Sequence, residues 1–586
     1  MSKTELTGRC LVAGAAAGEV LQAEIGLSFW GGVDPFTGTV IDTHHPLQGS
    51  CITGKILAIP SGRGSCTGSS VLLELILNGH APAALVFAED EEILTLGVIV
   101  AEEMFGRSLP VVSLGAESFQ ALRHASHAEV KDGRLIIDRP GSGGSSTTAA
   151  PATPPAPHLA LAPSDQAMLD GDKGQAAQVA MRIIKRMAEL QGAEKLIDIT
   201  QAHIDGCIYT GPASLRFAER LCDLGAQVSV PTSLNAISVD QRRWRQLGID
   251  PALGEPASRL ADAYLRMGAK PTFTCAPYLL DTAPAFGEQI VWAESNAVAY
   301  ANSVLGARTM KYPDYLDICI ALTGRAPLSG CHLDAHRHAT LQIDLPALTG
   351  LDDSFYPLLG YLIGGRSPNA IPVVTGLERA APNRDDLKAF GAAFATTSAA
   401  PMFHIVGVTP EADTLDQALG HRAPARRLAI TPADLRASWR ELNSATDRSV
   451  DLISLGNPHF SLSECAKLAD LCRGRRKHAG VTMIVACGRA TYEAAQAAGH
   501  VAVLEAFGVQ VLNDTCWCMI TEPVIPPSTR NLMTNSGKYA HYGPGLVGRK
   551  AHFGSLEACV AAACDARSPD RLPAWLGNVS NRGLAE

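Results

Sequence analysis

Residues 55–79, KILAIPSGRGSCTGSSVLLELILNG, place a strand, a glycine-rich turn and a helix in direct succession. Residues 55–60 form a short apolar run that ends at a proline, which is typical of a buried strand. Residues 61–70 contain only glycine, one arginine and small side chains. Residues 71–79 are apolar and close on Gly79, which is typical of a helix ended by a glycine cap.

The alternation of apolar runs with turns continues along the chain and predicts an α/β protein. In the first 140 residues, two further runs predict strands and so a layered β/α domain. Later runs, each followed by a loop and a helical pattern, predict doubly wound α/β subdomains, whose ligands bind beyond the carboxyl ends of the strands. The further predicted strands are 83–87, 110–114, 195–199, 226–230, 481–486 and 509–512, and the predicted helices include 180–190 and 215–224.

The clearest boundary lies at residues 141–163, GSGGSSTTAAPATPPAPHLALAP. This segment is rich in Gly, Ser, Ala and Pro and has no Lys, Arg, Asp or Glu, so it is typical of a linker with a flexible start and a stiffer end. It predicts a small domain at 1–140 and a large catalytic domain at 164–586, the latter made of two α/β subdomains.

Composition limits the classes of protein that fit. The chain has 586 residues, 46% hydrophobic and 18% charged, which excludes a disordered protein. A net charge of −9 argues against a nucleic-acid partner. No apolar run is long enough for a membrane helix. Fifteen cysteines without small-domain spacing predict reduced thiols, and therefore a soluble cytoplasmic protein. We expect a monomer or a small homo-oligomer.

The turn after residue 60 has the chemistry of an anion site. Glycines let a backbone approach a ligand closely, and the first amides of a helix favour an anion. Arg63 adds donors suited to a carboxylate, and Ser65 or Ser69 offers a hydroxyl. A plain turn with a helix cap is about equally compatible with the pattern.

Three cysteines follow strand-like segments far apart in the sequence: Cys275, Cys487 and Cys516. Such placement lets three segments converge on one metal centre. No CxxC spacing supports this, and buried cysteines are more often simple core residues. Cys518 is expected to pack in the core.

Small polar clusters at other strand ends predict a lined polar cleft, although each member alone is more often a helix cap or turn residue. The candidate residues in these clusters are His203, Thr232, Asn235, Glu294, Ser295, Asn457, His459, Asn535, Ser536 and Lys538.

Several longer motifs together resemble the aconitase X family. In the small domain these are residues 29–35 (FWGGVDP), 41–47 (IDTHHPL) and the GRGSCTGS loop; in the large domain they are 202–207, 230–235, 274–278, 287–297, 300–309, 514–516 and 534–538. The resemblance covers nearly the whole chain outside the linker. It implies an aconitase-like fold, with an N-terminal swivelling β/α domain and a large doubly wound region.

The resemblance also implies an iron–sulfur dehydratase, acting on cis-3-hydroxy-L-proline or on mevalonate 5-phosphate. The mevalonate branch generally has separate subunits and carries Gly-Cys-Pro-His, where this chain is fused and has residues 456–459, GNPH. These differences favour the hydroxyproline activity, with pyrroline-2-carboxylate as the product. Mevalonate 5-phosphate dehydration and a non-catalytic metabolite- or iron-sensing role are the alternatives.

The resemblance finally implies residue roles. Ser65 is the expected base, with Ser69 second; Lys538 and His203 are the other expected catalytic groups. Cys275, Cys487 and Cys516 are the expected ligands of a cluster, with a 2Fe-2S type favoured. The expected substrate-binding residues are Arg63, Gly64, Cys66, Thr67, Ser69, Thr232, Asn235, Glu294, Ser295, Asn457, His459, Asn535 and Ser536.

Overall fold

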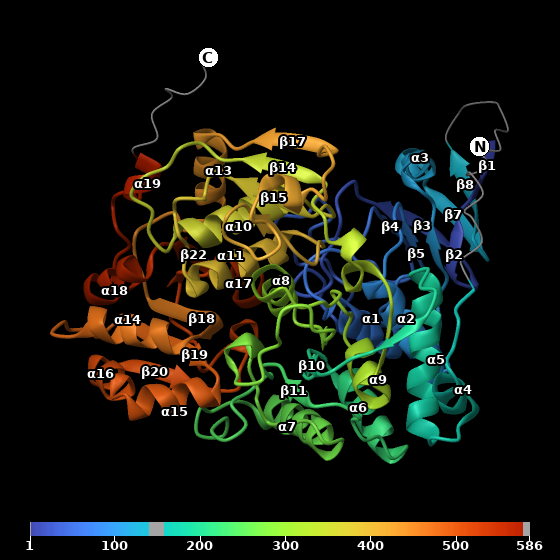
Figure 1. The fold of residues 1–586 in the computed structure, drawn as a ribbon, viewed down its shortest axis with the longest axis horizontal. Helices are drawn as coiled ribbons and strands as arrows, with labels where there is room; N and C mark the ends of the chain where they lie inside the picture. The colour runs from blue at the N-terminus through green and yellow to red at the C-terminus, as the bar shows by residue number, and fades with distance from the viewer. Residues whose placement is uncertain (1, 140–157, 578–586) are drawn as a thin grey trace. The chain divides into compact units, whose positions relative to one another are not determined.

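The computed structural model describes residues 2–139 and 158–577. The chain divides into two compact units. Figure 1 labels their helices and strands. The first unit consists of Met1–Thr232, Arg266–Gly268 and Tyr312–Ser329. The second unit consists of Ser233–Leu265, Ala269–Lys311 and Gly330–Glu586.

The first unit opens with an eight-stranded sheet in the order β1-β8-β7-β3-β4-β5-β6-β2. Its centre, β3 to β6, is parallel, and the outer pairs are antiparallel. The strands are β1 Ser2–Thr7, β2 Arg9–Val12, β3 Ala15–Gln22, β4 Ile56–Ile59, β5 Ala84–Phe87, β6 Val111–Ser113, β7 His127–Lys131 and β8 Arg134–Arg139. The predicted strands at 55–60, 83–87 and 110–114 are therefore confirmed.

Helix α1 (Gly68–Asn78) follows β4 across the glycine-rich turn, as the sequence predicts. Its side chains from Val71 to Ile76 are buried, because both faces of this helix are covered. Gly79 ends the helix in the left-handed region, at φ 86°, and its amide donates to Leu75 O. Helices α2 (Ile93–Phe105) and α3 (Ala116–Gln120) complete this part.

The rest of the first unit is mainly helical: α4 (Pro163–Asp170), α5 (Gln175–Leu190), α6 (Pro212–Asp223) and α9 (Leu316–Thr323), with short strands β9 (Leu196–Asp198), β10 (Ala202–Ile204) and β13 (Arg325–Pro327). The predicted helices at 180–190 and 215–224 and the strand at 195–199 are confirmed. The predicted strand at 226–230 is wrong. The amides of Val228 and Ser229 donate to Met267 O and Ala321 O, carbonyls at helix ends, so this segment joins no strand ladder.

The second unit contains two parallel sheets. The first has the order β16-β15-β14-β17, and the second β20-β19-β18-β21-β22. The strands are β14 Leu341–Asp344, β15 Pro372–Thr375, β16 His404–Ile405, β17 Arg426–Ala429, β18 Leu452–Phe460, β19 Thr482–Cys487, β20 Val509–Leu512, β21 Asn531–Thr534 and β22 Lys550–Phe553. The predicted strands at 481–486 and 509–512 and the doubly wound α/β class are confirmed.

Helices alternate with these strands, as a parallel sheet requires. Those of the first parallel sheet are α10 Phe355–Arg366, α11 Arg384–Thr397, α12 Leu415–Ala418 and α13 Pro432–Leu442. Those of the second are α14 Leu462–Cys472, α15 Arg489–Ala497, α16 His500–Phe507, α17 Gly537–Val547 and α18 Leu556–Asp565. The remaining elements are β11 Thr232–Leu234, β12 Val291–Trp292, α7 Pro251–Arg266, α8 Ser295–Tyr300 and α19 Ala574–Gly577.

Of the expected linker, only residues 158–163 are among the described residues. Residues 141–157 of the expected linker lie outside the described residues, and 158–163 lead into α4. The expected domain boundaries at 140 and 164 stay predictions.

Across the described ranges, no helix combines the length and apolar character that a membrane crossing requires.

One backbone contact predicts a measurable effect on stability. Gly456 in β18 has φ 95°, and a Cβ there would lie 2.1 Å from Ala486 O of β19. Gly474 has φ 72° with nothing within 4 Å of a Cβ, so Gly474→Ala adds only left-handed strain, about 1–2 kcal/mol. We expect Gly456→Ala to lose about 1–3 kcal/mol more, because it also forces the two strands apart. Thermal unfolding followed by circular dichroism compares the two variants; equal midpoints would contradict this account.

Candidate active site

The glycine-rich turn of the first unit is held by an ion pair. Arg63 Nη2 donates to Asp42 Oδ2 at 2.9 Å, and Asp42 is buried. Gly64 has φ 80°, a conformation that suits glycine and lets the turn reverse before α1. Asp42 belongs to the IDTHHPL motif, so two separate motifs of the small domain meet here. The Arg63 side chain is 28% exposed, and its guanidinium has more donors than this one ion pair uses.

The two candidate serines differ in what their hydroxyls do. Ser69 is fully buried, and its Oγ donates to Cys66 O at 3.0 Å and to Asp314 O at 3.2 Å. Ser65 is half-buried, and its Oγ accepts from Thr67 N at 3.2 Å. A hydroxyl committed to carbonyl oxygens cannot give up its proton without losing those bonds, whereas an amide donor stabilises an alkoxide. These contacts favour Ser65 as the base.

Buried carboxylates lie next to this turn, within the same unit. Thr67 Oγ1 donates to Asp205 Oδ2 at 3.5 Å, just after β10. Asp317 accepts from the backbone amides of Asp205 (2.7 Å), Ile318 and two other residues. Burial, and then the charges of Asp205 and Asp317, raise the pKa of Asp314 well above its usual range. His203 is buried in β10, two residues before Asp205.

Three thiols gather in the second unit. The amide of His459 donates to Cys275 Sγ at 3.3 Å, and Cys275 interacts electrostatically with Cys516. Cys516 in turn donates a hydrogen bond to Cys518, which also accepts from Asn457 Nδ2 at 3.4 Å. That hydrogen bond lowers the pKa of Cys518 to about 7, whereas the same bond and then burial raise that of Cys516. Burial raises the pKa of Cys275 to about 12.

Cys487 has a different neighbour. It ends β19, and Cys465 of α14 donates a hydrogen bond to it. Asn513 Nδ2 approaches Cys487 Sγ at 3.6 Å. The structure therefore brings Cys275 and Cys516 together with Cys518, and it pairs the third predicted ligand, Cys487, with another thiol. The sequence predicts that Cys518 packs in the core. Its spacing of two residues from Cys516 was the only sequence signal that the two thiols could meet. In the structure they are joined by a 3₁₀ turn at Trp517–Met519.

Lys538 forms a buried ion pair beside the thiols. Its Nζ lies 2.8 Å from Glu294 Oε1, and both side chains are largely buried. Burial alone would lower the pKa of Lys538, but Glu294, Cys518 and Cys516 outweigh it and raise that pKa well above its usual value, so the group is a fixed cation. Glu294 also caps α8 by accepting from the amides of Asn296 and Ala297.

His459 is held neutral by its surroundings. Its Nε2 contacts Thr515 O at 3.0 Å and its Nδ1 contacts Thr274 Oγ1 at 3.3 Å. Burial lowers its pKa to about 4. An imidazole that is neutral at pH 7 and engaged at both nitrogens is a poor proton donor to a leaving group, so these contacts favour a positioning role for His459.

The other predicted polar residues have local structural contacts. Ser536 caps α17 by accepting from Tyr539 N and donates to Asn457 O, and Asn535 is half-buried just before it. Ser295 is the buried first residue of α8. In the first unit, Thr232 Oγ1 donates to Val230 O. In the second, Asn235 Oδ1 accepts from Ala236 N. Gly64, Cys66 and Thr67 lie in the glycine-rich turn, and Cys66 is buried.

The donor set suits iron or an iron–sulfur cluster in kind, because thiolates are the ligands such groups prefer. Cys275, Cys516 and Cys518 are buried neighbours, and Lys538 offsets negative charge beside them. Within residues 2–139 and 158–577, no three His, Cys, Asp or Glu side chains already surround one point as a metal requires.

Four family models match: the aconitase X swivel domain at residues 5–138, first domain at 158–335, second domain at 339–440 and third domain at 450–565. The chain belongs to the aconitase X family.

Particular relatives match over their full length. A cis-3-hydroxy-L-proline dehydratase of Pseudomonas aeruginosa is 60% identical over 97% of this chain and 98% of its own. A protein of the same name from Hypocrea jecorina is 57% identical over 98% of both chains. The crystal structure of Thermococcus kodakaraensis aconitase X in its holo form matches with a TM-score of 0.62 at 30% identity, covering 69% of this chain and all of that one.

The two serines should respond differently to loss of their hydroxyls. We expect Ser69→Ala to lower the free energy of unfolding by about 0.5–1.5 kcal/mol, because two buried carbonyls lose their donor. Ser65→Ala should change it by less than about 0.5 kcal/mol, because the side chain is partly exposed. Thermal unfolding of matched preparations tests this. An equal loss in both variants would contradict the distinction.

Proposed function

We propose that this chain dehydrates cis-3-hydroxy-L-proline to pyrroline-2-carboxylate. The observation that carries the proposal is the likeness to two proteins named cis-3-hydroxy-L-proline dehydratase, at 57–60% identity over nearly the whole chain, small domain included. Such an enzyme is a hydro-lyase. It takes a small-molecule substrate; the cytoplasmic location and the oligomeric state expected from the sequence stay predictions.

The reaction needs a base for the proton at the carbon next to the carboxylate. We assign this role to Ser65, whose oxygen accepts the amide of Thr67. A serine hydroxyl is a weak base until its alkoxide is stabilised, and an amide donor supplies part of that stabilisation. Arg63, fixed by Asp42, presents donors of the geometry that binds a carboxylate.

The reaction also needs help for the departing hydroxide, which is a poor leaving group. An iron–sulfur cluster held by thiolates of this unit would supply Lewis-acid chemistry for that oxygen. Cys275 and Cys516 are the ligands that the contacts support best. For the third position, the hydrogen bond between Cys516 and Cys518 favours Cys518 over Cys487, the ligand expected from sequence. A 2Fe-2S type remains the favoured cluster.

Further residues of the second unit support this assignment. Asn457 stands where the mevalonate branch has a cysteine, and its amide contacts Cys518 Sγ. A thiol at that position would therefore reach the same group of sulfurs. Lys538, paired with Glu294, keeps its charge beside the thiols and so favours thiolate ligands there.

Incubation of the anaerobically purified protein with each candidate substrate tests the function. We expect cis-3-hydroxy-L-proline to yield pyrroline-2-carboxylate, detected as the imine by its reaction with an aminobenzaldehyde reagent. Mevalonate 5-phosphate should remain unchanged. Conversion of mevalonate 5-phosphate, or binding of either compound without turnover by cluster-loaded protein, would overturn the proposal in favour of the phosphomevalonate or sensing alternatives.

Four alanine variants test the ligand set. We expect Cys275→Ala, Cys516→Ala and Cys518→Ala to lose the visible absorbance and bound iron of the purified protein. Cys487→Ala, the matched control from the neighbouring strand, should keep most of both. The opposite result for Cys487 and Cys518 would restore the set expected from sequence, and full absorbance in all four would refute a thiolate-held cluster.

A further inference from the structure

The hydroxyl of Ser65 belongs to a chain of hydrogen bonds that ends on a buried carboxylate. Ser65 Oγ donates to Thr67 Oγ1 at 3.1 Å, and Thr67 Oγ1 donates to Asp205 Oδ2 at 3.5 Å. All three residues lie in the first unit. Thr67 and Asp205 are 1% and 2% exposed, so bulk water does not compete for either bond.

Asp205 lies in an unusually acidic environment. Asp314 and Asp317 are both fully buried beside it, and the charges of Asp205 and Asp317 help to keep Asp314 protonated. Asp317 is committed to the fold, because backbone amides occupy its oxygens. A proton that reaches Asp205 relieves repulsion within this group, which makes Asp205 a favourable acceptor despite its burial.

We propose that Thr67 and Asp205 are positioning residues that withdraw the hydroxyl proton of Ser65 and so make its oxygen the base of the reaction. The proton of Ser65 moves to Thr67 Oγ1 while the proton of Thr67 moves to Asp205. The Ser65 alkoxide then takes the proton from the carbon next to the carboxylate, and the electron pair of that C–H bond expels hydroxide. The proton that Ser65 has taken from carbon then leaves to the departing hydroxide, and the proton held by Asp205 returns through Thr67 to Ser65, so the substrate loses one water. This proposal rests on the proposed dehydration and on Ser65 as its base.

Thr67 offers a sharp test, because two substitutions separate its hydroxyl from its shape. Thr67→Val keeps the branched side chain and removes the hydroxyl; Thr67→Ser keeps the hydroxyl. We expect Thr67→Val to lower kcat at least about 100-fold with KM changed less than threefold, and Thr67→Ser to recover most of the rate. The isotope effect with substrate deuterated at C2 should rise in Thr67→Val, because proton abstraction becomes slower. Asp205→Asn should reproduce the effects of Thr67→Val.

The controls separate this proposal from the proposed function. Visible absorbance should match the wild type in Thr67→Val, since the thiols belong to the other unit. A wild-type protein inactive on cis-3-hydroxy-L-proline would refute the function itself. If the wild type is active, the role proposed for Thr67 and Asp205 is refuted by either of two results. These are a kcat of Thr67→Val within threefold of the wild type, or an unchanged isotope effect.

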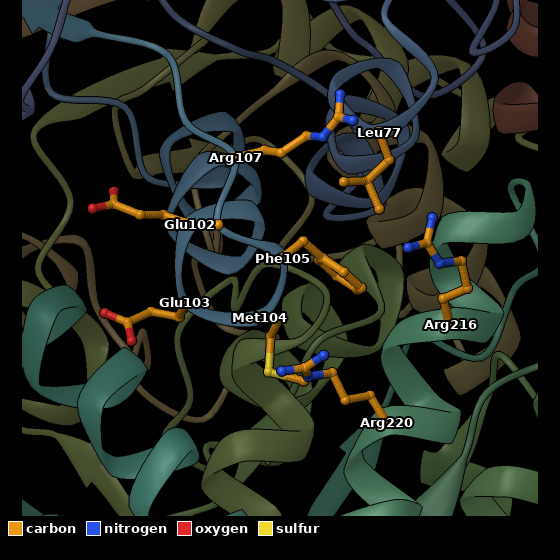
Figure 2. Close-up of a pocket in the computed structure, with 9 residues that line it drawn as sticks. Leu77, Glu102, Glu103, Met104, Phe105, Arg107, Arg216 and Arg220 are labelled. Carbon is orange, nitrogen blue, oxygen red and sulfur yellow. The ribbon is translucent and has the colours of Figure 1, made fainter.

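A separate crevice in the first unit has the chemistry of an anion site. It measures about 430 Å³ and lies between the end of α2 and the face of α6 (Figure 2). Three guanidinium groups surround a floor of Leu77 and Phe105: those of Arg107, Arg216 and Arg220. Arg216 also stacks over the ring of Phe105, with its carbon 5.3 Å from the ring centre.

The acidic residues of the lining do not neutralise these arginines. Figure 2 shows the carboxylates of Glu102 and Glu103 directed away from Arg216 and Arg220. Arg186 of α5 pairs with both carboxylates at 3.2 Å. Among the described residues, no carboxylate lies within 4 Å of the three guanidinium groups, although Arg216 acts on the buried Glu74 at longer range.

We also infer that this crevice binds a small molecule with two or more anionic groups. Its volume suits a compact ligand, and three guanidinium groups favour phosphate or carboxylate pairs. The walls come from α2 of the small domain and α6 of the following part of the chain, so a bound anion would link them. These same two parts contribute Thr67 and Asp205, respectively.

Calorimetric titration with pyrophosphate at low salt tests the crevice without any reference to activity. We expect binding in the wild type, and at least tenfold weaker binding in Arg216→Ala/Arg220→Ala. Arg123→Ala, which removes an exposed arginine paired with Glu24, serves as the control and should bind like the wild type. Absence of binding, or equal weakening by the control, would overturn the inference.

Discussion

Ionisable side chains buried beside one another determine what this chain can do chemically. In the first unit, Asp205, Asp314 and Asp317 are buried together, and burial with the neighbouring charges raises the pKa of Asp314 well above its usual range. In the second unit, buried thiols lie beside a lysine that burial cannot neutralise, because Glu294 and the sulfurs hold its charge. Both groups are costly to bury. The fold supports them with backbone amides and strand ends, as it does for Asp317 and Cys275.

The surrounding backbone holds the side chains of the buried carboxylates and of the buried thiols in fixed positions. Asp205 follows β10 and Asn457 lies within β18, so strand hydrogen bonds fix the backbone near each side chain. Glu294 caps α8 and pairs with Lys538, so the helix and the ion pair stabilise each other. His459 positions Cys275 through its amide, while its ring is held by Thr515 and Thr274. The same hydrogen bonds therefore stabilise the fold and position the side chains of the candidate site.

Membership of the family limits the reactions that fit this chain, and the contacts in the structure suggest which residues take part. Likeness to named dehydratases points to water elimination from a hydroxy amino acid. Ser65 and Ser69 differ in their contacts, since Ser65 accepts from an amide and Ser69 donates to carbonyls. Cys518, expected to pack in the core, and Cys487, expected as a ligand, each pair with a different thiol. Hydrogen bonds also connect the Ser65 hydroxyl to Thr67 and, through Thr67, to Asp205.

The sequence by itself determined the α/β class, most strands and helices, and the glycine-rich turn before α1, because apolar periodicity and glycine positions act locally. It also predicted Ser65, Lys538 and Cys516 as site residues through their motifs, and these roles stay predictions. Only the tertiary structure decided that residues 226–230 join no sheet, since their amides are taken by carbonyls distant in sequence. Likewise, the pairing of Cys487 with Cys465 and the approach of Asp205 to Thr67 depend on packing between segments up to 138 residues apart, which no local pattern records.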